Sequence, residues 1–132
     1  MKSIFSASWK SSASPRKQRK YRFNIPMHSR KEQLAVHLSK TLREKHKTRS
    51  LSVRTGDKVR VLRGTHKGKE GAVESIDAKN YRVYVAKVEH VRKEGGNSPY
   101  PLQPSNLMIV DLAKDKKRLK EDTPKKETAK KE

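Results

Sequence analysis

The sequence has no cysteine, and aromatic residues make up only 5% of it. Without cysteine the chain can form neither disulfides nor thiolate zinc sites, and its redox compartment cannot be read. The five histidines, at positions 28, 37, 46, 66 and 90, lack the spacing of metal ligands, so we expect no metal site. No apolar run approaches the ~20 residues that cross a bilayer, so we expect no membrane insertion.

Apolar and acidic residues are both scarce. Hydrophobic residues make up 31% of the 132 positions, too little to bury the whole chain, so we expect one small domain with long exposed segments. The 14 acidic residues stand against 34 lysines and arginines, which gives a net charge of +20. Such a charge repels itself unless a polyanion neutralises it. Nucleic acid is the first candidate, and an anionic membrane surface is the second.

The positive charge is unevenly distributed along the chain. Residues 1–54 carry 15 basic and 2 acidic side chains, residues 55–112 carry 10 and 7, and residues 113–132 carry 9 and 5. A weakly charged core therefore lies between a strongly basic arm and a charged tail. We predict a basic, disordered arm over 1–27, a helical extension over 28–54, a folded core over 55–112 and a charged, disordered tail over 113–132.

No arrangement typical of a catalytic site is present. Neither a Ser-His-Asp set nor paired carboxylates occur in a recognisable frame. Gly64 and Gly68 fall short of a Walker A loop, because three residues rather than four separate them and Glu70 follows the lysine. Asp57 is better placed to cap a turn than to act as a base. We therefore predict no enzymatic activity, no cofactor and no small-molecule substrate.

The region from Gly56 to Ile76 is predicted to form two strands joined by a shaped, basic loop. Val59 and Val61 alternate with basic residues, which is the period of a strand with one solvated face. Glycines at 64, 68 and 71 exclude a helix and favour a tight loop, because glycine tolerates positive φ and close backbone contact. This pattern resembles the KOW motif, which implies a small SH3-like β-barrel that often meets RNA. The alternative is an ordinary strand corner with solvated lysines.

Further segments with strand character complete the predicted barrel. Val73 and Ile76 lie three residues apart, so the second strand needs a bulge to place both on one face. Strands are also expected at Tyr81–Val85, Val88–Arg92 and Leu107–Leu112, with an irregular stretch around Pro99 and Pro101. The predicted fold class is mainly β, a small SH3-like barrel of about five strands with the extensions named above.

The N-terminal third combines a basic run with an amphipathic segment. In residues 15–23 cations can sit on phosphates while aromatics stack on bases, or the run can be a solvated tail. His28–Lys47 is predicted to be mainly helical, because leucines at 34, 38 and 42 form one stripe, and Ser39 can cap a second helix. A membrane-surface helix is the other reading, but bulky aromatics are missing from the stripe, which favours packing on the barrel.

A longer resemblance joins these regions. Its segments are Pro15–Tyr21, Leu38–Lys45, Val53–Asp57 and Pro104–Asn106, with Asn24, Pro26, His28, Arg30, Arg49-Ser50 and Met108-Ile109 between and after them. The chain resembles the universal large-subunit ribosomal protein family of the KOW class, archaeal L24 and eukaryotic L26, from about Pro15 to Leu112, with the archaeal branch closer. It departs at Gln103, where the family often has histidine.

The resemblance implies a structural constituent of the cytoplasmic large ribosomal subunit. Its expected partners are large-subunit rRNA, bound early in assembly near the polypeptide exit tunnel, and neighbouring ribosomal proteins. The residues expected to bind RNA are Arg16, Lys17, Arg19, Lys20, Tyr21, Arg22, Asn24, His28, Arg30, Lys31, Lys40, Arg43, Lys47, Arg49, Arg54, Arg63, Thr65, His66, Lys67, Gly68, Lys69, Arg92 and Lys93. For Tyr21 the alternative is packing on the barrel. The alternative functions are a KOW-type transcription elongation factor, which normally brings a second domain, and a general RNA- or polyanion-binding factor.

Overall fold

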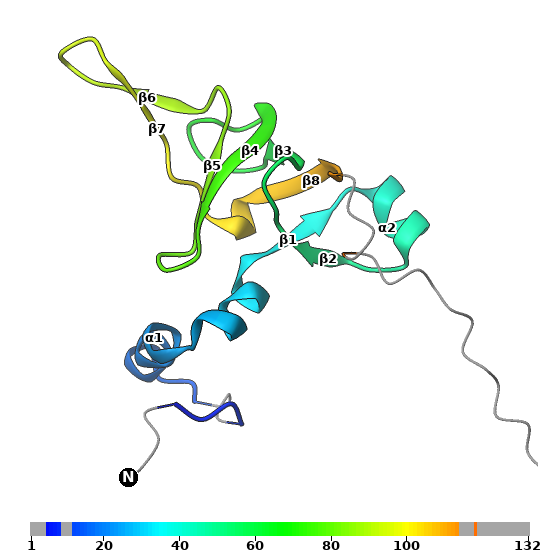
Figure 1. Cartoon of the computed structure of the whole chain (residues 1–132), viewed down its shortest axis with the longest axis vertical. Helices are drawn as coiled ribbons and strands as arrows, with labels where there is room; N and C mark the ends of the chain where they lie inside the picture. The colour runs from blue at the N-terminus through cyan, green and yellow to red at the C-terminus, as the bar shows by residue number, and fades with distance from the viewer. Residues whose placement is uncertain (1–4, 9–11, 114–117, 119–132) are drawn as a thin grey trace, which may run out of the picture.

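β-Strands dominate the chain, and they form a six-stranded sheet and a separate two-stranded hairpin (Figure 1). The computed structural model describes residues 5–8, 12–113 and 118. In chain order the elements are α1 (Pro15–Asn24), the 3₁₀ helix η1 (Met27–Leu34), β1 (Ala35–Leu38), α2 (Lys40–His46), β2 (Ser50–Ser52), β3 (Lys58–Val61), β4 (Glu70–Asp77), β5 (Arg82–Val85), β6 (Glu89–Val91), β7 (Asn97–Pro99), the 3₁₀ helix η2 (Pro104–Asn106) and β8 (Leu107–Asp111). The six-stranded sheet has the order β2, β1, β8, β3, β4, β5, and β1 and β8 form its parallel pair.

An aliphatic core lies on one face of the strands. Val59 and Val61 of β3 and Val83 and Val85 of β5 are at most 2% exposed, as their alternation with polar residues predicts. Ile109 of β8 is fully buried among them. Because the buried residues are almost all valine, leucine and isoleucine, burial of aliphatic area drives this fold without aromatic anchors.

Two features turn the sheet into a barrel-like shape: a bulge in β4, and a further segment that pairs with its edge strand β5. The pairing of β4 with β5 shifts between Val73 and Ser75, which is the bulge that the spacing of Val73 and Ile76 predicted. Beyond β5, Val83 and Leu102 exchange two backbone hydrogen bonds of 2.9 Å, and η2 then leads the chain into β8. These features give a small barrel-like fold and confirm the predicted class.

The helical extension predicted over residues 28–54 is helical in η1 and α2, but two strands, β1 and β2, interrupt it. Between the 3₁₀ helix η1 and the short α2 lies β1, which belongs to the main sheet. Leu34, Leu38 and Leu42 all pack in or against the core, but each comes from a different element. Leucine at every fourth position is typical of a helix, but Ala35–Leu38 form a strand because β1 pairs with β2 on one edge and with β8 on the other. Ser39 caps α2 as predicted, and its Oγ accepts a hydrogen bond from the N–H of Leu42 (3.4 Å).

The disorder predicted for the basic arm is wrong over residues 15–24, which form α1. Pro15 begins this helix, where a missing N–H removes no helical hydrogen bond. The helix buries none of its residues, so its basic side chains stay in solvent. The remaining disorder predictions fall largely on residues 1–4, 9–11, 114–117 and 119–132, which lie outside the described residues.

The stretch around Pro99 is also more regular than predicted. Residues 97–99 form β7, which pairs antiparallel with β6. Pro99 is tolerated because it ends the strand of a two-stranded ladder. The β6–β7 hairpin extends away from the six-stranded sheet (Figure 1), and its strands bury no residue.

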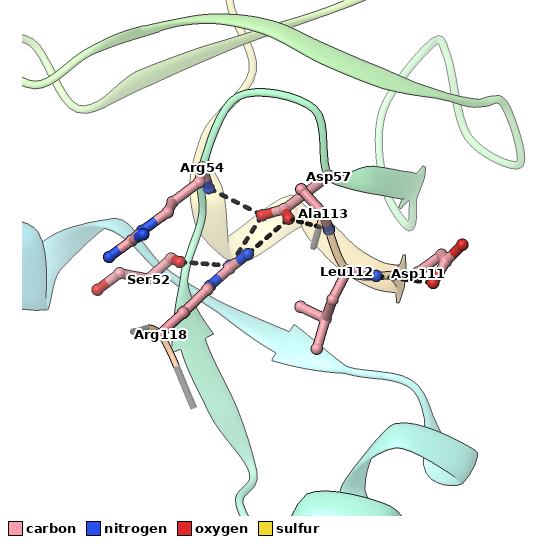
Figure 2. Close-up of polar contacts among 7 residues, drawn as sticks. All are labelled: Ser52, Arg54, Asp57, Asp111, Leu112, Ala113 and Arg118. Atoms are coloured by element: carbon pink, nitrogen blue, oxygen red, sulfur yellow. Dashed lines mark hydrogen bonds and ion pairs between the residues drawn. The ribbon is translucent and has the colours of Figure 1, made fainter. Parts of the chain in front are cut away.

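Asp57 holds together the turn that opens β3 (Figure 2). Its carboxylate is fully buried and accepts hydrogen bonds from the N–H of Arg54 (2.8 Å) and of Ala113 (3.0 Å). Arg118 pairs with both carboxylate oxygens, at 2.5 and 2.8 Å, and also donates to the carbonyl of Ser52 (2.6 Å). The expectation that Asp57 caps a turn is confirmed, and the ion pair adds a link between β2, β3 and the segment after β8.

Candidate nucleic-acid interface

The loop that joins β3 to β4, residues 62–69, is shaped by its own backbone. The N–H of Lys67 donates to the carbonyl of Gly64 (3.1 Å), and the N–H of Gly68 donates to the carbonyl of Val61 (2.8 Å). Gly64 and Gly68 adopt the left-handed backbone, with φ of 92° and 87°, as their spacing suggested. The loop therefore has a defined shape without a ligand, which lowers the entropy lost when it binds one.

Three cations of this loop, Arg63, Lys67 and Lys69, are exposed. Among the described residues, no carboxylate lies within ion-pair distance of any of them. On the neighbouring strands the situation differs, because Glu70 accepts a hydrogen bond from Nε of Arg60 (2.6 Å) and also pairs with its Nη2. A phosphate can therefore approach the loop without displacing an internal partner.

A pocket of about 260 Å³ opens beside the loop. The predicted residues Arg63, Thr65 and His66 line it, and the ring of His66 meets that of Tyr100 edge to face with centroids 4.9 Å apart. Four further polar residues that were not predicted to bind RNA also line it: Arg82, Tyr100, Gln103 and Asn106. No local pattern predicts this grouping, because three separate segments meet only once Leu102 pairs with β5.

Arg30 was predicted to contact RNA, but its guanidinium group is engaged within the protein. It donates to the carbonyls of Ile25 (2.9 Å), Lys79 (3.0 Å) and Phe23 (3.2 Å). The group also lies 5.7 Å from the centroid of the Tyr81 ring, and Tyr81 Oη donates to the carbonyl of Arg22 (2.9 Å). The bonds to Arg22, Phe23 and Ile25 satisfy carbonyls at the end of α1, which have no partner within a helix, and the bond to Lys79 reaches the β4–β5 turn. Arg30 and Tyr81 thus position the basic helix against the β4–β5 turn.

The side chains of α1 form a basic surface of their own. Its five cations are exposed: Arg16, Lys17, Arg19, Lys20 and Arg22. The ring of Tyr21 lies 5.1 Å from that of Phe5, at an interplanar angle of 33°. This contact is with the N-terminal segment, and packing of Tyr21 on the barrel stays a prediction.

The other predicted residues are spread over the molecule. Asn24, His28 and Lys31 lie at the junction of α1 with η1, Lys40, Arg43 and Lys47 belong to α2 and its C-cap, Arg49 and Arg54 flank β2, and Arg92 and Lys93 lie at the β6–β7 turn. Helix α1, helix α2 and the hairpin project from three different ends of the molecule (Figure 1). The predicted cations thus form several separate patches, and one of them adjoins the pocket.

We also searched the described residues for membrane-spanning helices and for metal centres. None of the helices in residues 5–8, 12–113 and 118 has the length and apolar character needed to span a bilayer. The same part of the chain contains no group of three or more histidine, aspartate or glutamate side chains arranged to hold a metal ion.

The comparisons with known proteins agree with the resemblance seen in the sequence. A family model that describes the ribosomal proteins L26 of eukaryotes and L24 of archaea matches residues 12–121, which include the loop and the whole lining of the pocket. The chain is 42% identical over 107 residues to the large ribosomal subunit protein uL24 of Methanosphaera stadtmanae, a match that covers 81% of this chain and 92% of that protein. This chain therefore belongs to the family of eukaryotic L26 and archaeal L24 ribosomal proteins.

Proposed function

We propose that this protein is a structural constituent of the large ribosomal subunit in the cytoplasm and binds large-subunit rRNA directly. Membership in a ribosomal protein family indicates a structural protein and not an enzyme. The net charge of +20 supports a polyanionic partner, because a small core cannot carry that charge without neutralisation. The observation that carries the proposal is the preformed loop 62–69, whose cations have no acidic partner among the described residues.

The geometry supports recognition by charge together with shape. The left-handed glycines let the loop backbone approach phosphates closely, while Lys67 and Lys69 neutralise them. Contacts of this kind position a protein on folded RNA without reading its base sequence. Helix α1, α2 and the hairpin would add phosphate contacts from other sides, so the RNA partner must be large enough to reach several faces.

Titrations across salt test this proposal. Affinity of the full chain for a folded large-subunit rRNA fragment should fall steeply with salt, with a log–log slope of roughly −0.7 to −0.9 per phosphate contacted. Scrambled RNA and duplex DNA should bind more weakly at physiological salt. A nearly flat salt dependence, or equal affinity for unrelated duplex DNA, would count against the proposal.

Fractionation of cell lysate separates this function from the other classes. A ribosomal constituent should stay with large subunits at high salt, whereas an elongation factor or a general polyanion binder should dissociate. Reconstitution with ordered addition of proteins tests the finer proposal, binding early in assembly near the exit tunnel. Early binding predicts that the protein joins bare rRNA before most other proteins are present.

A further inference from the structure

The pocket beside loop 62–69 is lined mainly by polar and aromatic side chains. Besides the hydroxyl of Thr65, its polar lining consists of two guanidinium groups, two side-chain amides and two rings: Arg63, Arg82, Gln103, Asn106, His66 and Tyr100. None of the described residues that line it carries a carboxylate. Within the described part of the chain, the side chains of Arg63, Arg82, Gln103 and Asn106 make no hydrogen bond or ion pair with the protein. These four side chains are therefore available to a ligand.

Backbone pairing fixes the walls of this pocket. The N–H of Leu62 donates to the carbonyl of Asn106 (2.8 Å), which ties the loop to η2. Tyr100 donates from its N–H to the carbonyl of Val88 (3.0 Å), and the next pairing along the chain joins Leu102 to β5. Because the three segments that form the pocket are joined to the barrel, the pocket exists before any ligand arrives.

The chemistry of the lining selects an anionic ligand with a flat, polar-edged ring. Guanidinium groups bind phosphate oxygens, amides hydrogen-bond to base edges, and aromatic rings stack on base faces. Tyr100 is 37% exposed and offers part of its ring. The volume of about 260 Å³ lies below the usual range of small-molecule pockets, about 300–1,000 Å³, which favours a single nucleotide over a longer segment as the occupant.

We propose that this pocket binds a single unstacked nucleotide of the RNA, with its base against Tyr100 and His66 and its phosphate on Arg63 and Arg82. The inference rests on the proposed function, since the exposed Lys67 and Lys69 of the same loop bind the phosphates that lead the strand into the pocket. It adds a base-binding step to an interface that otherwise contacts the RNA backbone. A base in this pocket is removed from its helix stack, and its Watson–Crick edge is covered by Gln103 and Asn106.

Base-specific and backbone-specific footprints of one complex test the inference. The full chain is bound to a large-subunit rRNA fragment, then probed with dimethyl sulfate and carbodiimide at base edges and with hydroxyl radicals at the backbone. The wild type should protect the base edge of one unpaired nucleotide within the backbone footprint. Tyr100→Leu should return that nucleotide to the reactivity of free RNA and weaken binding by about 5- to 150-fold, the loss expected for one base–aromatic stack.

Matched variants control for folding and for charge. Met27→Ala removes a large apolar side chain that is 61% exposed at the start of η1 and does not line the pocket, and Lys79→Gln removes one exposed cation from the β4–β5 turn. Both should leave the protected base unchanged. Arg82→Gln removes a pocket cation with no protein partner, so it carries the test if Tyr100→Leu fails to fold.

The outcomes distinguish the two proposals. If the wild type gives a backbone footprint but neither Tyr100→Leu nor Arg82→Gln changes any base reactivity beyond the controls, the pocket inference is overturned and the proposed function stands. If the wild type gives no footprint on large-subunit rRNA, the proposed function fails and the inference fails with it. Loss of protection at one base in both pocket variants, with the backbone footprint retained, supports the inference.

Discussion

At the scale of single residues, Asp57 and Arg118 form a buried ion pair. The carboxylate is fully buried and the guanidinium side chain is 5% exposed, so both charges are removed from water. A charge buried in this way is tolerated only while its partner and its hydrogen bonds remain. Because Asp57 also caps the turn before β3, this pair stabilises the strand that leads into loop 62–69.

We predict that Arg118→Met lowers the free energy of unfolding by about 3–5 kcal/mol, because it leaves a buried carboxylate without its counter-ion. Urea denaturation of the full chain measures this change. Arg92→Met, at the exposed β6–β7 turn, is the matched control and should stay within about 0.5 kcal/mol of the wild type. Asp57→Asn combined with Arg118→Met should cost less than the sum of the single changes. A loss below about 1 kcal/mol in Arg118→Met would contradict a stabilising role for the pair.

Among the described residues, Asp77 is a group whose pKa is shifted by its surroundings, so it makes stability depend on pH. The side-chain amide of Asn80 donates to its carboxylate (2.7 Å), and the N–H groups of Asn80 and Lys79 donate as well, which lowers the pKa of Asp77 below its ordinary value of 3.8. A pKa that is lower in the folded state contributes stability above the unfolded pKa. That contribution is lost as the pH falls through the folded value.

We predict that Asn80→Ala raises the pKa of Asp77 toward its ordinary value, since the largest cause of the lowering is removed. An NMR titration of the Asp77 carboxyl measures the shift directly. The variant should also lose less stability than the wild type as the pH falls below 3.8, because its folded and unfolded pKa values lie closer together. Asn97→Ala, in β7, should leave the titration of Asp77 unchanged. An unchanged pKa in Asn80→Ala would show that the backbone donors alone hold the carboxylate.

At the scale of elements, the glycines of β3–β4 act by two different physical mechanisms. Gly68 has a φ of 87° and an added Cβ would meet nothing within 4 Å, so a substitution there strains the backbone without a clash. Gly71 has an ordinary φ, but an added Cβ would lie 2.5 Å from the carbonyl oxygen of Ala86 and 2.8 Å from Val85 Cγ1. The first glycine shapes the loop, and the second lets β4 approach β5.

We predict that Gly68→Val reduces discrimination between cognate and scrambled RNA while leaving the salt slope unchanged. A β-branched residue tolerates positive φ poorly, so the loop must change shape, but no charge is removed. Binding titrations across salt on both RNAs measure the two effects separately. Val91→Ile in β6 is a control that enlarges an exposed valine without positive φ. If discrimination survives in Gly68→Val, the shape of the loop is not what selects the RNA.

Gly71→Ala should instead act on stability, because the added methyl group meets the backbone of Ala86 and cannot move aside. Overpacking of this kind costs about 1–3 kcal/mol. Thermal and urea unfolding of the full chain check the value. Stability equal to the wild type would mean that β4 and β5 separate more easily than their bulged pairing suggests.

At the scale of the whole molecule, the excess of basic residues and the main sheet lie in different parts of the chain. The main sheet begins at Ala35, while residues 1–27 carry seven basic and no acidic side chains. Helix α1 buries none of its residues and is joined to the barrel through backbone carbonyls that Arg30 and Tyr81 contact. The arm can therefore supply cations to the RNA while the barrel folds without it.

We predict that deletion of residues 1–27 weakens RNA binding and flattens the salt slope, by roughly 0.7 to 0.9 for each phosphate that the arm no longer neutralises. The thermal midpoint should fall only slightly, because the deletion removes one buried side chain, Ile25, whereas the sheet and its core cluster lie outside it. A full-length variant with the five cations of α1 replaced by glutamine should flatten the slope similarly, since it keeps helix formers and removes only charge. An unchanged slope in both variants would show that the arm does not contact the RNA.

Sequence alone determined those features that depend only on residues close together in the chain. Val59 and Val61 alternate with charged residues, and that alternation alone places them in the core of a strand. The left-handed Gly64 and Gly68 follow from glycine spacing, and the proposal of a polyanionic partner follows from the charge balance. These features could be predicted because period, backbone freedom and net charge are properties of the residues themselves.

Tertiary structure alone decided the features that depend on distant partners. Leu38 enters the core as a strand residue because β8, from the far end of the chain, offers hydrogen bonds to β1. Arg30 carries the same charge as its neighbours in sequence, yet remote carbonyls engage it. The pocket is assembled when Leu102 pairs with Val83 and brings Tyr100 to His66. Pairing across long stretches of chain leaves no local period, so only the folded barrel shows where these side chains meet.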